Sequence, residues 1–222
     1  MNKVICYFHS RDLDGCCSGA IVKKKYPDCE LYGIDYGEEF PWNKAKEYPL
    51  AFMVDFSLPI EDMAKLNKIT ELVWIDHHIS AIKDYDKHLD LMEEYELNEK
   101  TEIQGIREVG KAGCELTWEY LFSDKKTPEA VRLLGSYDTW RYVNSGKEED
   151  IDVLPFQMGA RMEDLEPASE MWDVLLISND LQATFHINQL TEKGKTILDY
   201  QDSQNTMTCK SNAFEVNFEG LN

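Results

Sequence analysis

The sequence predicts an α/β fold with a doubly wound, mostly parallel sheet, helices on both faces and a helical connector after the sheet. Two observations lead to this prediction. Short apolar segments alternate with helix-like segments, and three of the apolar segments end in polar side chains. Alternation of this kind is typical of βαβ units, whose strands run parallel. Because ligands of such sheets bind beyond the carboxyl ends of the strands, the polar endings indicate a functional crevice.

The first 75 residues supply the strands of this sheet. Each expected strand is a short apolar run, and helix-like segments separate the runs. One helix follows Gly15, and another begins at Pro59, because the first turn of a helix tolerates proline. Ile60, Met63 and Leu66 then share one face of that second helix. The strands are expected at residues 4–8, 31–34, 51–54 and 72–75, and the first helix through residues 16–22.

The remainder of the chain is expected to be mainly helical. Apolar residues recur at helical spacing in 111–122 and in 128–134, and Thr127 is expected to cap the second of these helices. Two more helices are expected after Ser169, the second of them over residues 185–200.

Two segments do not fit this helical pattern. Residues 83–100 are acidic, and we expect them to form a surface segment that is partly a loop. Residues 214–218 alternate apolar and polar side chains, which is the period of a strand.

The composition excludes several classes of protein. The chain of 222 residues has a formal net charge of −19, whereas a protein that coats long double-stranded nucleic acid needs a basic surface. A hydrophobic content of 43% supports a folded core, and no apolar run approaches the ~20 residues that a membrane span needs. The six cysteines form no CxxC pair, and no secretory leader precedes the first strand. We therefore expect a reduced, cytoplasmic protein without a membrane partner.

Side chains suited to metal binding gather at the ends of three predicted strands. His9, Asp12 and Asp14 lie in one loop that Gly15 allows to turn tightly, so they can converge on one point. The further candidates are Asp55 and His77, at two other strand ends, and Asp138, after an apolar helix. Such a set suits two divalent cations about 3.5–4 Å apart that share a carboxylate and a hydroxide.

Each of these residues, taken singly, has an ordinary structural explanation. An aspartate after a strand is most often a helix cap or a turn residue, so Asp55 alone would not indicate a ligand. A lone His77 or His78 would more often be a hydrogen-bonded structural residue. Caps do not require two adjacent histidines together with a His-x-x-Asp-x-Asp loop, so the joint occurrence favours a metal site. Carboxylates and imidazoles suit Mn²⁺, Mg²⁺ or Zn²⁺.

The motifs together resemble those of the DHH phosphoesterase superfamily. The loop from His9 to Gly15 looks like the family's first motif, and Asp55 in a Val-Asp-Phe-Ser run looks like its second. Asp76-His77-His78 looks like the third motif, and Asp138 like the fourth. The four motifs follow in the family's order, and the helices after them look like its connector.

The resemblance implies a hydrolase that cleaves phosphoric ester bonds by in-line attack of a hydroxide bridging two Mn²⁺ ions, with Mg²⁺ or Co²⁺ as substitutes. Asp55, Asp76 and His78 would be the catalytic residues. Asp76 would orient a histidine, and His78 would face the substrate phosphate. The implied ligands are His9, Asp12 and Asp55 for one ion, and Asp14, Asp55, His77 and Asp138 for the other.

Three basic side chains are further candidates for contact with a substrate phosphate, since phosphate sites usually recruit cations. They are Arg107, Lys111 and Arg141. Lys111 lies just before an expected helix, and an ordinary helix start is the alternative explanation. The adjacent Cys16 and Cys17 are expected to be packing residues.

The expected substrates are short oligonucleotides or nucleotides, because small residues follow Gly15 as in the family's nucleotide phosphodiesterases. An inorganic pyrophosphatase or exopolyphosphatase is the alternative. A non-catalytic nucleotide-binding regulatory module is an alternative of another class, but the presence of every candidate ligand favours the enzyme. A homodimer is a candidate assembly.

Three segments are expected along the chain. Residues 1–145 form the catalytic domain, and residues 146–210 form a helical extension and connector. Residues 211–222 are a candidate first strand of a C-terminal substrate domain. Many family members carry a glycine-rich Gly-Gly-Gly-His-type motif in that domain, and this sequence contains none. We therefore expect either a chain truncated after this strand or a lineage that works without the domain.

Overall fold

The computed structural model describes residues 3–94, 102–178 and 180–214. Its centre is a four-stranded sheet made of β1 (Val4–His9), β2 (Glu30–Ile34), β3 (Leu50–Val54) and β4 (Glu71–Ile75). The strand order is β2-β1-β3-β4, and all three neighbouring pairs are parallel. The predicted parallel α/β fold is therefore confirmed.

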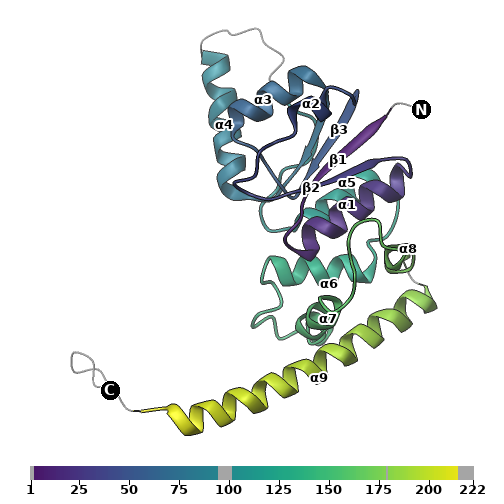
Figure 1. Cartoon of the computed structure of the whole chain (residues 1–222), viewed down its shortest axis with the longest axis vertical. Coiled ribbons are helices and arrows are strands. Elements are labelled where there is room, and N and C mark those ends of the chain that lie inside the picture. The colour runs from purple at the N-terminus through teal and green to yellow at the C-terminus, as the bar shows by residue number, and fades with distance from the viewer. Residues whose placement is uncertain (1–2, 95–101, 179, 215–222) are drawn as a thin grey trace.

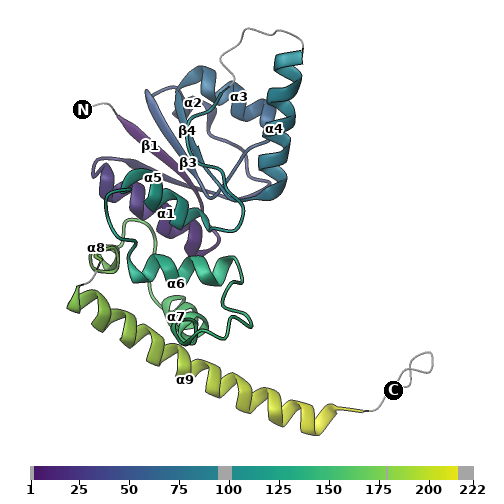
Figure 2. The same cartoon turned by 180° about the vertical axis from the view of Figure 1, so that it is seen from behind.

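Helices cover both faces of the sheet, as Figures 1 and 2 show from opposite sides. Cys6 and Phe8 of β1 point toward the core that contains α1 (Leu13–Lys25) and α5 (Gly113–Leu121). Tyr7, between them, points to the opposite core, which contains α3 (Ile60–Ile69) and α4 (Ile79–Glu94). Successive side chains of a strand alternate between faces, so a strand covered on both sides is apolar at every position.

The strand order reverses between β1 and β3, and this reversal positions the site. From β1 the chain passes through α1 to β2, then crosses back by α2 (Trp42–Ala45) to β3 on the other side of β1. The loops that leave β1 and β3 consequently lead to helices on opposite faces of the sheet. In open parallel sheets the space between two such loops forms the ligand crevice.

The second half of the chain is helical, as predicted. Beyond α5, the helices α6, α7 and α9 lie at successively greater distance from the sheet (Figure 1). None of the helices in the described residues is both long and apolar enough to cross a bilayer. These elements are α6 (Glu129–Asp138), the 3₁₀ helix η1 (Glu148–Asp150), α7 (Val153–Ala160), α8 (Met171–Leu175) and α9 (Leu181–Asn212).

One expectation about a helix boundary was wrong, and a second is covered only in part by the described residues. Thr127 does not cap α6, because Pro128 takes the N-cap position in an extended conformation and makes no side-chain capping bond. Of the segment 83–100, which was expected to be partly a loop, the residues up to Glu94 are helical, and residues 95–100 lie outside the described part of the chain. Ala81, Tyr85 and Leu89 explain this, since their four-residue spacing packs one face of α4 against the sheet.

The C-terminal expectations are only partly covered by the described residues. The last expected helix is longer than the predicted 185–200, since α9 runs to Asn212. Phe214 is exposed, and residues 215–222 lie outside the described residues. The strand expected at 214–218 and the domain boundaries therefore remain predictions.

Two glycines allow α9 to contact α7 at backbone distance. A Cβ added at Gly159 of α7 would lie 1.8 Å from the carbonyl oxygen of Leu190 in α9. A Cβ added at Gly194 of α9 would lie 1.7 Å from the carbonyl oxygen of Pro155 in α7. Any larger residue at either position would force the two helices apart.

We predict that Gly194→Ala lowers the free energy of unfolding by about 1–3 kcal/mol, because the added methyl group overpacks the α7–α9 contact. Urea unfolding followed by circular dichroism measures this change. Ser203→Ala, on the exposed part of α9, is the control and should leave stability nearly unchanged. Equal stability of the two variants would show that the α7–α9 contact contributes little.

Candidate metal centre

The candidate site lies at the carboxyl edge of the sheet. His9 is the last residue of β1, Asp55 directly follows β3, and Asp76 directly follows β4. His77 comes next in the chain after Asp76. Because parallel strands end at the same edge, these residues meet although up to 68 positions separate them.

The loop after β1 folds back against its own strand. A Cβ at Gly15 would lie 2.0 Å from the carbonyl oxygen of His9, so this close approach requires glycine. Asp12 caps α1 by accepting a hydrogen bond from the Gly15 amide at 2.9 Å. The other oxygen of Asp12 lies 2.7 Å from Nδ1 of His9. Asp12 is therefore both a helix cap and a neighbour of the candidate ligand His9.

Asp55 lies at the centre of the cluster. It is 2% exposed and has a left-handed backbone conformation, with φ at +53°. Aspartate and asparagine tolerate this conformation better than most residues. Its Oδ1 is 3.1 Å from Nε2 of His77, and its Oδ2 is 3.7 Å from Nδ1 of His9. The two oxygens of one carboxylate thus face two different histidines.

The N-terminus of α5 holds the third carboxylate. The backbone amides of Gly113 and Cys114 each donate a hydrogen bond of 2.8 Å to Asp14, one to each oxygen. Helix N-termini favour anions in this way. A Cβ at Gly113 would lie 2.6 Å from Cβ of Asp55, so glycine also lets α5 approach the centre.

Asp138 completes the cluster from α6, of which it is the last residue. Its Oδ2 lies 3.4 Å from Nε2 of His77. The same nitrogen lies 3.1 Å from Asp55 and 3.7 Å from Asp14. Three carboxylates therefore surround one imidazole nitrogen.

The ligand atoms fall into overlapping groups within the described residues, each spanning no more than 4.8 Å. Asp55 belongs to two of the groups, and its position between the others fits a shared ligand. Carboxylate oxygens and imidazole nitrogens are a donor set suited to divalent cations such as Mn²⁺. The groups are His9 with Asp12 and Asp55, Asp14 with His77 and Asp138, and Asp55 with His77 and His78.

The pKa values reflect negative charge concentrated in a buried place. Burial raises the pKa of Asp14 well above its usual value, and the neighbouring carboxylates add to the effect. Burial, together with Asp55, raises the pKa of Asp138 to about 6. Burial alone would also raise the pKa of Asp55, but hydrogen bonds from His77 and His9 lower it to about 2. The carboxylates of Asp12 and Asp55 raise the pKa of His9 to about 10.

Asp76 serves a different purpose, because it is fully buried and holds His78. Its Oδ1 accepts hydrogen bonds from the amides of His77 at 2.7 Å and His78 at 3.2 Å, and lies 2.6 Å from Nδ1 of His78. Trp74 donates to its other oxygen at 3.2 Å. The His78 ring is thereby fixed, and the hydrogen bond with Asp76 raises the pKa of His78 to about 9.

The three basic side chains predicted to contact phosphate have other partners in this structure. Arg107 donates to the backbone carbonyls of Trp74, Gln104 and Ile103. Lys111 and Arg141 pair with glutamates on α5 and in the loop before it. Their partners are Glu108 and Glu119 for Lys111, and Glu115 for Arg141. A phosphate contact by any of the three remains a prediction.

Two residues after β2 belong to the site but were not singled out from the sequence. Asp35 lies 3.5 Å from Nε2 of His9 and pairs with Arg11. Tyr36 packs against Phe56, with ring centroids 4.7 Å apart and the rings tilted by 39°, and its ring centroid lies 6.3 Å from that of His78. The signal was present, since residues 31–34 form an apolar run that ends in aspartate, like the other strands.

Comparisons with known proteins give a limited result. No family model and no curated protein matches the chain. A solved structure of RecJ in complex with Mn²⁺, from Thermus thermophilus, is similar over 91% of this chain with 13% sequence identity and a TM-score of 0.41. The similar region is 36% of that RecJ chain, so this chain spans about a third of its length. At this level of similarity the comparison assigns no activity.

We predict that metal binding at this site releases protons. His9 is protonated at neutral pH, because its pKa is about 10, and it must lose that proton to become a ligand. The affinity for Mn²⁺ should therefore increase at least about tenfold for each unit of pH between 7 and 9, and the contribution of His9 should level off above its pKa. Isothermal titration calorimetry in buffers of different ionisation heat measures both the affinity and the number of protons released.

The matched variant is His9→Asn, which keeps a polar side chain but has no proton to lose. When the logarithm of its affinity for Mn²⁺ is plotted against pH, the slope should be smaller by about one than the slope of the wild type. An affinity for Mn²⁺ that does not vary with pH in the unmodified protein would contradict the assignment of His9 as a ligand.

Proposed function

We propose that this protein is a divalent-metal-dependent phosphoesterase. The observation that carries the proposal is the convergence of four aspartates and two histidines on one edge of the sheet, with Asp55 shared between groups. Within the described residues, the ion pairs of these aspartates are all with histidines, and none is with a lysine or arginine. Such a concentration of carboxylates favours binding of divalent cations. The four sequence motifs support the same conclusion.

The cations would polarise the phosphoryl oxygens and lower the pKa of the attacking water, which is the usual contribution of a two-metal site. The residues of the chain would hold the cations in position. Asp14 is held by the amides of α5, and Asp55 is fixed between two histidines. His9, Asp12, His77 and Asp138 complete the two ligand groups.

His78 is proposed to contact the substrate phosphate. Its Nδ1 faces the buried Asp76, so Nε2 is available to donate a hydrogen bond to an anion. The hydrogen bond with Asp76 raises the pKa of His78, and a protonated ring would strengthen such a bond. Asp76 is then a positioning residue that acts through His78.

Short oligonucleotides and nucleotides are the proposed substrates, with inorganic pyrophosphate or polyphosphate as the second candidate. The net charge of −19 disfavours long duplexes, which are bound through a basic surface. A non-catalytic regulatory module would not need two complete ligand groups. The cytoplasmic location, the homodimer and the choice of Mn²⁺ over Mg²⁺ or Co²⁺ remain predictions from the sequence.

The test is a substrate panel assayed with Mn²⁺, with EDTA, and with the variant Asp55→Asn. We expect phosphate release that EDTA abolishes and that Asp55→Asn lowers by at least about 100-fold, because the shared ligand loses its negative charge. Asparagine tolerates the left-handed backbone of this position, so the variant should keep its fold. The panel contains di- to pentaribonucleotides, nucleoside monophosphates, cyclic dinucleotides, pyrophosphate and polyphosphate.

Asp62→Asn is the matched control, because Asp62 is a partly exposed aspartate in the first turn of α3. It should retain the activity of the unmodified protein. If Asp55→Asn turned over substrate as fast as Asp62→Asn, the aspartate at the centre of the cluster would not be a metal ligand. Turnover that continues in EDTA would reject metal dependence itself.

A further inference from the structure

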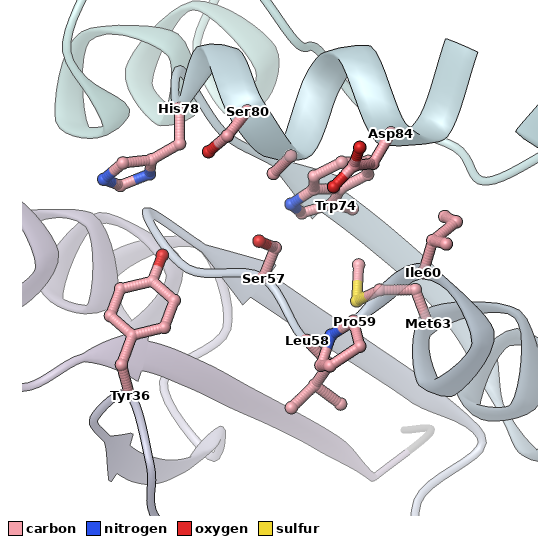
Figure 3. Close-up of a pocket in the computed structure, with 11 residues that line it drawn as sticks. Tyr36, Ser57, Leu58, Pro59, Ile60, Met63, Trp74, His78, Ser80 and Asp84 are labelled. Carbon is pink, nitrogen blue, oxygen red and sulfur yellow. The ribbon is translucent and has the colours of Figure 1, made fainter. Parts of the chain in front are cut away.

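A cavity of about 440 Å³ opens directly beside the metal centre, on the α3–α4 face of the sheet. Figure 3 shows His78 and Tyr36 at one end, with Asp84 and Ile60 at the other. The walls come from the loop after β3, the first turns of α3 and α4, and the end of β4. This volume is in the range of sites for small organic ligands.

The wall of the cavity far from His78 is largely apolar. Leu58, Pro59, Ile60 and Met63 line one side, and the ring of Trp74 lies opposite (Figure 3). An inorganic phosphate or pyrophosphate gains nothing from such a surface, whereas a planar aromatic group buries its faces there.

Apart from His78, the polar groups that line the cavity are uncharged or negatively charged. Ser57 and Ser80 offer hydroxyl groups, and the carboxylate of Asp84 lies near the far end (Figure 3). No lysine or arginine lines the cavity among the described residues. A second phosphate would therefore meet a negative carboxylate without a compensating cation, which disfavours a polyanion.

The side of the cavity formed by Trp74 is held in place by hydrogen bonds, whereas Tyr36 is exposed to solvent. Trp74 is buried, and its indole N–H donates to the backbone carbonyl of Phe56 at 3.1 Å and to Asp76 at 3.2 Å. Since Asp76 also holds His78, the cavity and the phosphate-facing histidine share one rigid support. Tyr36, in the loop after β2, is 53% exposed and lies at the same end of the cavity as His78 (Figure 3).

We propose that this cavity binds the nucleobase of a substrate whose phosphate lies at the metal centre. The inference rests on the proposed function, and it selects nucleotides over pyrophosphate and polyphosphate. Leu58 and Ile60, which are half-buried, supply the apolar surface for the base, and the two serines offer partners for its polar edge or for ribose hydroxyls. Asp84 excludes a second phosphate and favours the N–H donors of a base.

The direct test compares two ligands that differ only in the base. Adenosine 5′-monophosphate and ribose 5-phosphate are titrated into the Mn²⁺-loaded full chain by calorimetry, with inorganic pyrophosphate as a third ligand. We expect the nucleotide to bind at least ~10-fold more tightly than ribose 5-phosphate, since burial of a base against aromatic and apolar side chains contributes this much. Equal affinities would overturn the proposal.

Two variants locate the effect in the cavity. Ala81→Phe fills the space beside α4, and it should bring the affinity ratio of nucleotide to ribose 5-phosphate close to one. Asp84→Lys replaces the negative charge with a positive one, and it should shift the preference toward pyrophosphate at least ~10-fold. Asp90→Lys makes the same charge change farther along α4, at a residue that does not line the cavity, and should keep the wild-type preferences.

Thermal unfolding and Mn²⁺ binding of each variant show whether it is folded. If Ala81→Phe does not fold, Asp84→Lys and its control decide the question, and equal preferences in those two variants would reject the cavity as the base site. Base-dependent binding without any turnover would disprove the catalytic proposal while leaving the binding site in place. Turnover of oligonucleotides with no base-dependent binding would disprove the cavity alone.

Discussion

The repulsion between carboxylates at the carboxyl edge of the sheet is the constraint on which the rest of the site depends. Asp12, Asp14, Asp55 and Asp138 lie within reach of two imidazole rings, and the described part of the chain places no lysine or arginine against them. Burial makes this arrangement costly, because the charged form of each group loses hydration. Divalent cations would remove the cost, and the histidines and backbone amides reduce it in their absence.

Several unusual backbone features serve this arrangement. Gly15 lets the loop after β1 return to within contact distance of His9, and Gly113 lets the N-terminus of α5 approach both Asp14 and Asp55. The positive φ of Asp55 turns its carboxylate into the crevice directly after β3. Such strained or closely packed positions are tolerated where the surrounding structure fixes them, and they occur often at functional sites.

The sheet and the ligand cluster could be predicted because both depend on local patterns. Each strand is a short apolar run, and polar residues at the ends of parallel strands must share one edge. The partners of the basic side chains were harder to predict. Lys111 and Arg141 pair with glutamates of α5 and of the loop before it, and only the tertiary structure shows where these lie. Asp35 also directly follows an expected strand, at residues 31–34, but it belongs to none of the four motifs and was not singled out. The cavity beside His78 is lined by three separate stretches of the chain, at residue 36, residues 57–63 and residues 74–84, so no single stretch of sequence predicts it.

The presence of two metal ions at the predicted positions is the claim on which the other conclusions rest. Anomalous X-ray diffraction from crystals grown with Mn²⁺ tests it most directly, because the anomalous signal locates each ion without reference to activity. We expect two peaks, one among His9, Asp12 and Asp55 and the other among Asp14, His77 and Asp138. The absence of any peak at saturating Mn²⁺, or peaks only at sites remote from these residues, would contradict a metal centre at this edge of the sheet.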